Sequence, residues 1–547
     1  MFCVKFNFSR MLFVLFTFVL QFSQISLAQA TAPSQTESFD VVVIGGGIGG
    51  LATVDELMKK GVKKVLLLEA ADRVGGKMWT QRGSNENAPY YERGAELVNT
   101  SDVELINLIK SLGLELVERR FKRDLRSELL MFRERHLTED GRVIEGELRS
   151  FSFEQLVEKM HEFPQDLAVL EKILQLQALR SSQDPQIKSE TLKEIRSMTA
   201  RSAVEGGVYT TAFFESIMKS EFGVSLSEVN AEVLLDYASV AIESSKSGQK
   251  RFNIEIIPNA DEKFRVKNGT DSIIRALEVK YSAVIRKNSE VTGVRQTAPN
   301  DFEISLNGAS RKIKTQHVVF AVPAYDLPKL NIVSAEVSPR RIQEAAALPY
   351  GHNAKIFLVF NERFWDRAYD ANSRGFGGVG VLESGVQFWD TTENQRQTKE
   401  GVITLFPGKW PTDAGEQKKR LAEIMVDLRK VPGFEGLDAH LVKVDVHNWQ
   451  RSYAGVFNTF IAKSPRLFAE NLASNMYFVG ADKDNNTRGQ ISESYGYMNG
   501  AVRTAIRATS RIMQKLQTST QNASAPVLPI RSLKPKKMAC SALLLGA

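Results

Sequence analysis

Three closely spaced glycines and one carboxylate are the residues in this sequence whose spacing first suggests chemistry. Gly45, Gly47 and Gly50 form the pattern G-x-G-x-x-G, and Glu69 lies twenty-four residues after the first glycine. Such glycines allow a tight turn and let the backbone approach a pyrophosphate, to which the next helix offers its free N–H groups. Glu69 could accept hydrogen bonds from a ribose. The pattern predicts a dinucleotide site; the alternative is a glycine-rich turn in an α/β domain without a nucleotide.

The elements expected around these residues fit a dinucleotide site. The unbroken β-branched run at 40–44 predicts a buried strand before the glycines, and 51–60 predicts a helix that stops at Gly61. A second buried strand is expected at 65–68, directly before Glu69. This order is one βαβ unit, the start of a Rossmann-like domain.

The segment after the second strand bears on the type of dinucleotide. It reads A-A-D-R-V-G-G-K from Ala70 to Lys77, and it resembles the flavin-containing amine oxidase family, in which an acid is followed by R-x-G-G-[RK]. The resemblance implies that Arg73, Gly76 and Lys77 bind FAD, with the glycine pair close to the flavin and its diphosphate. Lys77 stands where the family more often has arginine, which keeps the charge but loses a bidentate fork.

Four further segments resemble the same family and follow in its order. Residues 92–97 match the segment that passes over the flavin ring, and residues 318–323 match a strand ending in A-x-P. Residues 477–482 match the motif F-x-G-x-[ED], and residues 495–501 match the motif G-Y-M-x-G-A. The resemblance implies further FAD contacts from Gly480, Asp482 and Met498. Val291 matches the strand position whose backbone meets the adenine.

The resemblance also implies residues that act on a substrate. Lys355, in the mostly apolar stretch 353–360, resembles the lysine that holds a water against the flavin N5; the alternative is an edge-strand lysine that reaches solvent. Tyr497 resembles one wall of an aromatic cage around the substrate amine; the alternative is a residue that packs at a helix start. The second wall falls on Asn458, so Phe457 beside it is the candidate replacement.

Glu96 bears on the class of substrate. The matching family position often holds Gln, Asn or a small residue facing the flavin, and amino-acid oxidases often carry an arginine nearby. A carboxylate at Glu96 would attract an ammonium group and repel a carboxylate, which favours amines over amino acids. The alternative is that Glu96 forms a structural ion pair with Arg93 or another cation.

Together these residues predict FAD-dependent oxidation of a small-molecule amine to an imine, with oxygen as the acceptor and hydrogen peroxide as a product. The imine then hydrolyses to an aldehyde or ketone and releases ammonia or an amine. The alternatives are an L-amino-acid oxidase, a carotenoid- or porphyrinogen-type desaturase on the same fold, and a flavin-binding protein without turnover. A desaturase would need neither Lys355 nor Tyr497.

Composition restricts the class of protein. The 547 residues are 43% hydrophobic and 25% charged, which is typical of a globular chain of two or three domains. The cysteines are Cys3 and Cys540, at the two ends of the chain. We therefore expect that no cysteine attaches the FAD covalently, and we expect no metal site. The net charge is +7, of which residues 1–30 carry +2 and residues 521–547 carry +4. The nearly neutral remainder argues against a nucleic-acid partner.

The N-terminus has the pattern of a signal peptide. Lys5 and Arg10 precede an apolar run, and the small-residue pattern A-Q-A follows at 28–30. The alternative is a membrane anchor. We therefore expect an exported protein, periplasmic or secreted, with no membrane span after cleavage.

The order of the segments predicts an α/β fold with two domains. A Rossmann-like FAD-binding domain is interleaved with an α+β substrate domain, which is helix-rich before residue 250. The FAD-binding domain is expected at 38–100, 255–340 and 448–515, the substrate domain at 101–254 and 341–447, and a flexible basic tail at 517–547.

Overall fold

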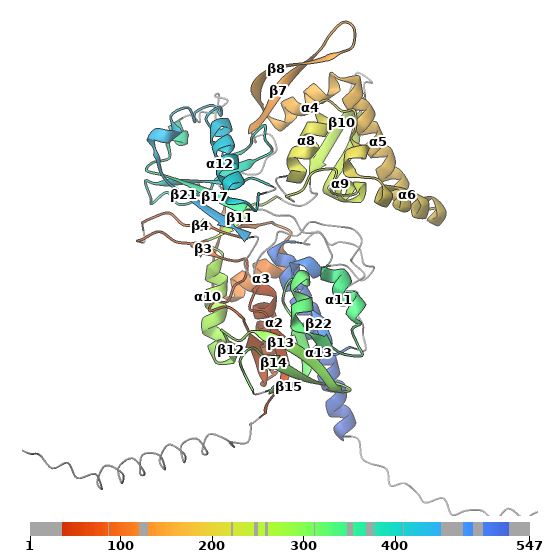
Figure 1. Ribbon diagram of the computed structural model, residues 1–547, viewed down its shortest axis with the longest axis vertical. Coiled ribbons are helices and arrows are strands. Elements are labelled where there is room, and N and C mark those ends of the chain that lie inside the picture. Colours follow the sequence, from red (N-terminus) through yellow and green to blue (C-terminus); the bar gives the residue numbers. More distant parts are fainter. Residues whose placement is uncertain are drawn as a thin grey trace, which may run out of the picture.

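The protein, described by a computed structural model, is an elongated molecule with two lobes (Figure 1). The structure describes residues 36–524 except 86, 120–128, 220–222, 245–249, 257–260, 311, 347–353, 368–375, 377, 409, 450–473 and 485–495. Phe457 and the expected signal peptide lie outside the described residues. Among the helices that are described, none combines the length and the apolar character that crossing a bilayer requires.

The lower lobe in Figure 1 is built on an eight-stranded sheet. Its central strand β1 pairs in parallel with β2 and β15, and β15 also pairs in parallel with β22. The strands are β1 (Glu37–Ile44), β2 (Val65–Leu68), β12 (Ile285–Arg286), β13 (Val291–Ala298), β14 (Asp301–Leu306), β15 (Lys312–Phe320), β16 (Ile332–Val333) and β22 (Met476–Phe478). The apolar run in β1 is continuous because both faces of the sheet are covered.

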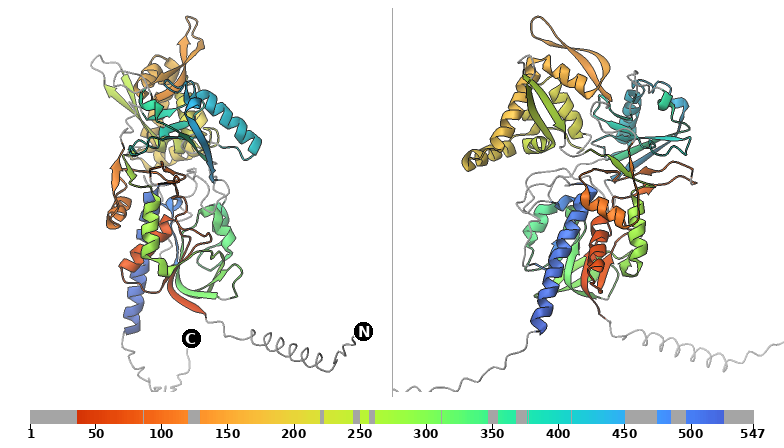
Figure 2. Two further views of the ribbon diagram at one scale, coloured as in Figure 1. Left: turned by 90° about the vertical axis from the view of Figure 1, so that its left-hand side faces the viewer. Right: turned by 180° about the vertical axis from the view of Figure 1, so that it is seen from behind.

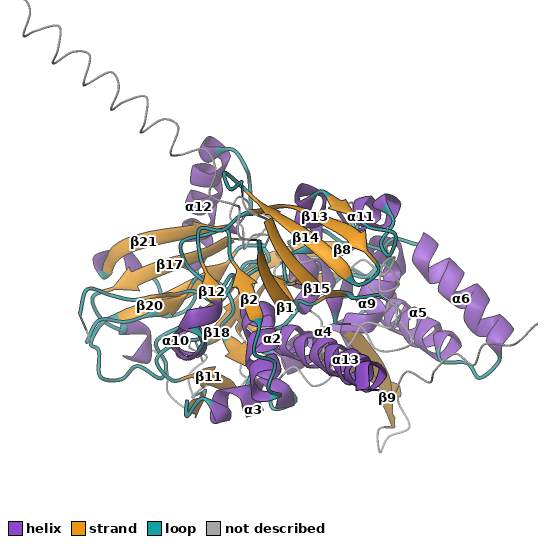
Figure 3. Ribbon diagram, turned by 90° about the horizontal axis from the view of Figure 1, so that it is seen from below, coloured by secondary structure: helices purple, strands orange, loops and turns teal. Residues whose placement is uncertain are grey.

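Helices cover one face of this sheet, as Figure 3 shows from below. They are α2 (Ile48–Lys59), α3 (Val103–Ser111), α10 (Asp271–Lys280) and α13 (Met498–Ser524). The other face packs against the 3₁₀ helix η4 (Ala324–Leu330) and α11 (Pro339–Ala346). α13 runs past residue 517, where the tail is expected to begin, because no glycine or proline interrupts the chain between Gly500 and Pro526.

α3 connects the expected substrate segment to the core of the lower lobe. Its Leu105, Leu108 and Ile109 are buried in the same cluster as α2 and α13, and the Leu105 N–H donates to Asn499 Oδ1 at 2.8 Å. The structural unit that carries the large sheet therefore extends beyond residue 100.

The upper lobe contains a seven-stranded sheet and a group of helices, which the right-hand view of Figure 2 shows side by side. The sheet has the order β21 (Leu441–Asn448), β17 (Ala354–Phe360), β20 (Gly401–Phe406), β19 (Gln387–Asp390), β18 (Val379–Val381), β7 (Leu129–Leu137) and β8 (Val143–Phe151), and α12 (Ala414–Leu428) packs on it. The helices are α4 (Phe153–His161), α5 (Pro164–Arg180), α6 (Pro185–Ser197), α7 (Ala200–Ala203), α8 (Thr210–Ile217) and α9 (Ala231–Tyr237). Strands β7 and β8 form a hairpin within the stretch where helices are expected.

Two small strand groups lie between the lobes in Figure 1. One is the ribbon of β3 (Thr80–Gln81) and β4 (Tyr91–Glu92). The other is a three-stranded sheet of β5 (Leu97–Val98), β11 (Phe264–Val266) and β6 (Leu116–Glu118). Of the candidate site residues, Glu96 directly precedes β5 and Lys77 lies three positions before β3.

Candidate active site

The glycine turn joins the C-terminal end of β1 to α2. Gly45 has a φ of 105°, and a Cβ on it would lie 2.8 Å from the Ala321 carbonyl oxygen. A Cβ on Gly50 would lie 2.0 Å from the Gly45 carbonyl oxygen, whereas a Cβ on Gly47 would meet no described atom within 4 Å. The turn therefore packs tightly on its inner side and leaves open space at Gly47, beside the N-terminus of α2, where a diphosphate could lie.

Glu69 lies next to this turn, at the end of β2. Its Oε2 accepts the Gly46 N–H at 2.6 Å, and its Oε1 accepts the Ala71 N–H at 2.8 Å. The Ser289 N–H donates to the Glu69 carbonyl at 2.8 Å, which brings the start of β13, with buried Val291, beside the acid. Each carboxylate oxygen can accept further hydrogen bonds, as contact with a ribose would require.

The glycine pair contacts the same turn. The Gly75 N–H donates to the Gly46 carbonyl at 2.8 Å, and Gly76 has a φ of 54°. Arg73 donates to the Gly76 carbonyl at 2.8 Å, and its guanidinium lies 4.2 Å from the Trp79 ring centroid. Arg73 thus fixes the glycine pair from one side, and the Gly75 N–H joins the pair to the first glycine turn.

The C-terminal motif borders the glycine turn from β22. Gly480 has a φ of 146°, and Asp482 accepts the Ala324 N–H at 3.0 Å and the Lys483 ammonium at 2.6 Å. Burial lowers the pKa of Lys77, an effect that the nearby Asp482 carboxylate opposes. Lys77 and Asp482, two of the expected cofactor ligands, therefore lie close enough to interact electrostatically.

Met498 and Tyr497 lie at the start of α13. Met498 is buried in the core shared with α2, and half-buried Tyr497 directly precedes it. A Cβ on Gly49 would lie 3.6 Å from the Ala501 carbonyl oxygen, so the first turns of α2 and α13 are in contact. The candidate cage residue Tyr497 is thus at the same end of the lower lobe as the glycine turn.

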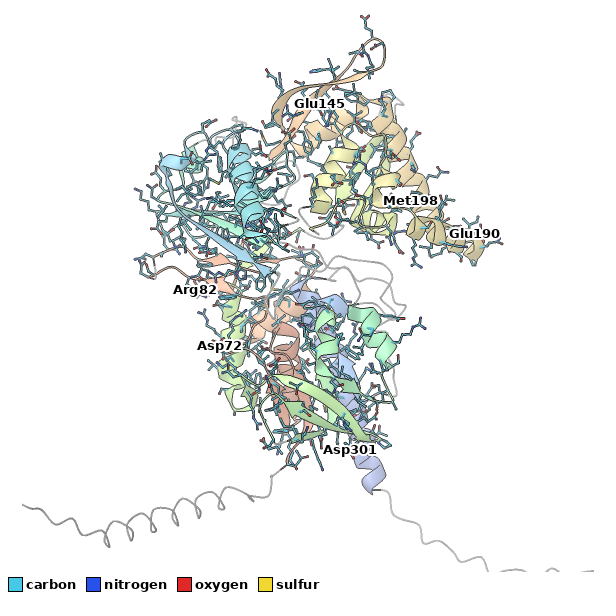
Figure 4. The ribbon with its side chains drawn as sticks, in the orientation of Figure 1. Asp72, Arg82, Glu145, Glu190, Met198 and Asp301 are labelled. Atoms are coloured by element: carbon cyan, nitrogen blue, oxygen red, sulfur yellow. The ribbon has the colours of Figure 1, made fainter. Side chains whose placement is uncertain are left out.

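A hydrogen-bonded path leads from the glycine pair to Lys355. Figure 4 places Asp72 in the lower lobe and Arg82 on the ribbon between the lobes, so the chain crosses between lobes in this stretch. The Ala95 N–H donates to the Lys77 carbonyl at 3.0 Å. The Lys355 ammonium then donates to the Gly94 carbonyl at 2.8 Å.

Lys355 is buried in the interior of the upper sheet. Strand β17 lies between β20 and β21, so Lys355 is not on an edge strand. Its ammonium donates to the Gly94 carbonyl, to the Glu92 carbonyl at 3.3 Å and to Glu96 Oε2 at 2.7 Å. All three contacts hold the cation against the segment that links the two lobes.

Glu96 is the ionised partner of two cations. Its Oε2 accepts the Lys355 ammonium, and its Oε1 accepts Arg265 Nη1 and the Trp389 indole N–H, the latter at 3.0 Å. Burial by itself would raise the pKa of Glu96, but Lys355 and Arg265 lower that pKa to about 2. The cations that pair with Glu96 are Lys355 and Arg265, and Arg93 instead binds Asp445.

The ion pairs continue beyond Glu96 into a buried chain of alternating charge. Arg265 Nε and Arg119 Nε both donate to Glu393 Oε1, at 2.9 and 2.8 Å. We name Lys355, Glu96, Arg265, Glu393 and Arg119 the charge chain; every side chain in it is at most 9% exposed. Arg119 Nη1 also lies 3.7 Å from Glu262 Oε2, at the end of the chain away from Lys355.

A family comparison identifies the chain. The model of the flavin containing amine oxidoreductase family matches residues 48–513. The chain belongs to this family. The resemblance inferred from the motifs is therefore confirmed, and the protein is a flavoprotein oxidoreductase that acts on amines.

Individual relatives of this amine oxidoreductase agree with the family. A flavin-containing amine oxidase of Oncorhynchus mykiss is 24% identical over 532 residues, which cover 90% of this chain and 91% of the relative. The flavin-containing amine oxidase B of Homo sapiens is 43% identical over 76 residues, 14% of each chain.

Solved structures of two amine oxidases have the same fold. A putrescine oxidase redesigned in its cofactor binding superposes with a TM-score of 0.64 at 18% identity and covers 88% of this chain and 100% of its own. Cyclohexylamine oxidase from Brevibacterium oxydans superposes with a TM-score of 0.63 at 18% identity, over 88% and 99%. The expected two-domain amine oxidase fold is confirmed.

Sequence reasoning missed three members of the charge chain in this amine oxidoreductase, Arg119, Arg265 and Glu393. The sequence signal for Arg265 is a charged residue between Phe264 and Val266, since a cation in an apolar strand is costly unless it is paired. No comparable signal marks Arg119 or Glu393.

Proposed function

We propose that this protein oxidises an amine to an imine with non-covalently bound FAD and passes the electrons to oxygen, which yields hydrogen peroxide. The observation that carries the proposal is the buried Lys355 ammonium at the end of the path from the glycine turn. When bound, the flavin supplies the acceptor for a hydride equivalent from the carbon next to a neutral amine. The open space at Gly47 and the acid at the end of β2 fit the diphosphate and ribose of such a cofactor.

Lys355 provides a fixed positive charge in a site from which water is largely excluded. A buried cation stabilises negative charge that develops on oxygen as it is reduced, without reorganisation at the moment of reaction. The longest contact of the ammonium, 3.3 Å to the Glu92 carbonyl, is the one that a water molecule could replace most easily. We propose that the Lys355 N–H that makes this contact is the one that holds the water.

The substrate is proposed to be an amine without a carboxylate next to it. Glu96 supports this less directly than its charge suggests, because Lys355 and Arg265 offset that charge. Arg265 supports it better, since its guanidinium is engaged by Glu96 and Glu393 and is therefore already paired. The named amines of the structural relatives, putrescine and cyclohexylamine, are of this class. We propose that Tyr497 orients the amine.

The direct test is an anaerobic half-reaction. The full chain is purified with FAD and mixed with primary amines, polyamines and L-amino acids while the flavin absorbance is followed. Bleaching by an amine, followed by recovery and peroxide formation on admitting oxygen, is expected. Bleaching by amino acids alone, or a flavin that stays oxidised with every compound, would overturn the proposal.

We also propose that the protein is exported. The support is the cationic start with Lys5 and Arg10, the apolar run after it and the A-Q-A pattern at 28–30. N-terminal sequencing of protein recovered outside the cytoplasm should begin at Thr31. A cell-associated protein that retains Met1 would contradict export.

A further inference from the structure

The charge chain alternates in sign along its whole length. Starting from Lys355 it runs cation, carboxylate, cation, carboxylate, cation, through Glu96, Arg265, Glu393 and Arg119. Its members come from five separate segments, and it crosses from β17 through β11 toward β6. Only the last contact, with Glu262, involves a side chain that is 19% exposed. Salt therefore screens this chain much less than it screens surface ion pairs.

The Lys355 end of the charge chain is directed toward the cofactor path. Lys355 donates to the Gly94 carbonyl, and Gly94 lies so close to Lys77 that a Cβ on it would be 1.9 Å from the Lys77 carbonyl oxygen. Lys77 follows the glycine pair whose Gly75 contacts the glycine turn. Lys355 is the member of the charge chain that touches this path through two backbone carbonyls.

The sign of each charge and its place in the charge chain determine how the five residues differ in their electrostatic effect. We expect each charge to act on the path with its own sign, and to act more weakly the farther it lies from the path. Removal of one partner also leaves its neighbour uncompensated, which reinforces the sign of the effect. The chain is thus a row of buried charges whose contributions to the potential at the flavin differ in sign and size.

We infer that the charge chain tunes the reduction potential of the flavin, with Arg265 acting as the positioning residue that holds Glu96 and Glu393 as the one that holds Arg265. The inference rests on the proposed function only in requiring bound flavin. Two-electron reduction of the flavin with uptake of one proton adds one negative charge, so a nearby cation favours reduction and a nearby carboxylate opposes it. The electrons come from the external reductant in the experiment and from the amine in turnover.

The test is a set of reduction potentials, measured by anaerobic titration with dithionite against reference dyes and without any amine. Lys355→Met should lower the equilibrium constant for reduction about tenfold and Glu96→Gln should raise it about tenfold, which is about 30 mV each for a two-electron couple. Glu393→Gln should raise it less than Glu96→Gln does, and Arg265→Met should lower it. Arg265→Lys keeps the charge and should restore most of the potential.

Arg196→Met is the matched control, because it breaks an ion pair with Glu232 outside the charge chain and should leave the potential unchanged. Shifts of opposite sign for Lys355→Met and Glu96→Gln support the inference, since general damage to the fold cannot alternate in sign. Shifts in the same direction, or no shift in either variant, overturn it. If Arg265→Met does not fold, the other variants still decide the question.

Failure of this inference is distinct from failure of the proposed function. A protein that binds flavin, bleaches with amines and has the same potential in every variant disproves only the tuning by the charge chain. A protein that shows the alternating shifts but reacts with no amine overturns the proposed function and leaves the tuning by the charge chain standing. A protein that takes up no flavin overturns both.

Discussion

At the scale of single residues, the site depends on buried charges that are paired. Lys355 lies in an apolar strand, where an unpaired ammonium would be unstable, and Glu96 compensates it at 2.7 Å. Breaking a buried ion pair by removing one partner costs about 3–5 kcal/mol, because the other charge is left without compensation. The residues that we propose to serve the reaction therefore also affect the stability of the fold.

Lys355→Met should slow the reaction of the reduced flavin with oxygen by about 10²-fold, the usual cost of removing one preorganised electrostatic group. Reduction of the flavin by amine should change less, by no more than the about tenfold shift expected in the equilibrium constant for reduction. Stopped-flow measurement of the two half-reactions separates these effects. Lys443→Met, at a largely exposed lysine on β21, is the control, and equal reoxidation rates in wild type and Lys355→Met would contradict the assigned role.

Glu96 and Glu92 should change the pH dependence of stability in opposite directions. The pKa of Glu96 lies at about 2, below its ordinary value of 4.5, so its contribution is present above pH 4.5 and is lost as the pH falls toward 2. Burial raises the pKa of Glu92 to about 7, so its contribution is present below pH 4.5 and is lost as the pH rises through 7. Each contribution is at most about 3 kcal/mol.

Urea unfolding at a series of pH values tests this contrast. Glu96→Gln should flatten the loss of stability on the acid side, and Glu92→Gln should flatten the decline between pH 4.5 and 7. If both variants keep the slope of the wild type over those ranges, neither pKa shift is real.

At the scale of elements, the glycine turn shows how local sequence creates a ligand site. The turn ends β1, opens α2 and lies against Glu69 at the end of β2, and these three elements are adjacent in the sequence. The glycines of the turn are required for different structural reasons. Gly50 is required by packing, whereas Gly47 keeps space open.

This difference predicts different outcomes for two alanine substitutions. Gly47→Ala should leave the stability of the flavin-free protein within about 1 kcal/mol of wild type and weaken FAD binding, because its Cβ fills the open space. Gly50→Ala should destabilise the flavin-free protein by about 1–3 kcal/mol, because its Cβ meets the Gly45 carbonyl. Equilibrium unfolding and FAD titration measure the two effects. Gly436→Ala, which has open space far from the turn, is the control, and equal FAD affinity in Gly47→Ala and wild type would refute the assignment.

At the scale of the whole molecule, the lobes are connected by the ribbon of β3 and β4. Tyr91 donates to Asp445 Oδ2 at 2.7 Å, and Arg93 Nη2 lies 3.1 Å from the same oxygen, which joins the ribbon to β21. Asn499 at the start of α13 accepts the Leu105 N–H. These contacts hold the glycine turn, Tyr497 and Lys355 in one connected framework.

Bound FAD should therefore stabilise the molecule as a whole. A free FAD concentration about 100-fold above Kd should add about 2.7 kcal/mol to the free energy of unfolding. Thermal melts over a range of FAD concentrations should show a steadily rising Tm. A Tm that does not depend on FAD would contradict reversible, non-covalent binding.

The sequence was sufficient to predict the βαβ unit and the family, whereas the cofactor roles of the candidate residues stay predictions. These depend on patterns in which the residues that act together are near one another in the chain, such as the glycine turn and Glu69. Helix ends were less predictable: α13 continues at least to Ser524, past the expected start of the tail, because no glycine or proline lies between Gly500 and Pro526.

Only the tertiary structure decided which charges pair. Lys355 and Glu96 are separated by 259 positions, and Arg265 and Glu393 by 128, so no local periodicity brings them together. Their pairing depends on how three parts of the chain pack together: β17 of the upper sheet, which carries Lys355, β11, which carries Arg265, and the segment that links the two lobes. Burial then makes each pairing obligatory, because an ionised side chain removed from water is stable only beside an opposite charge.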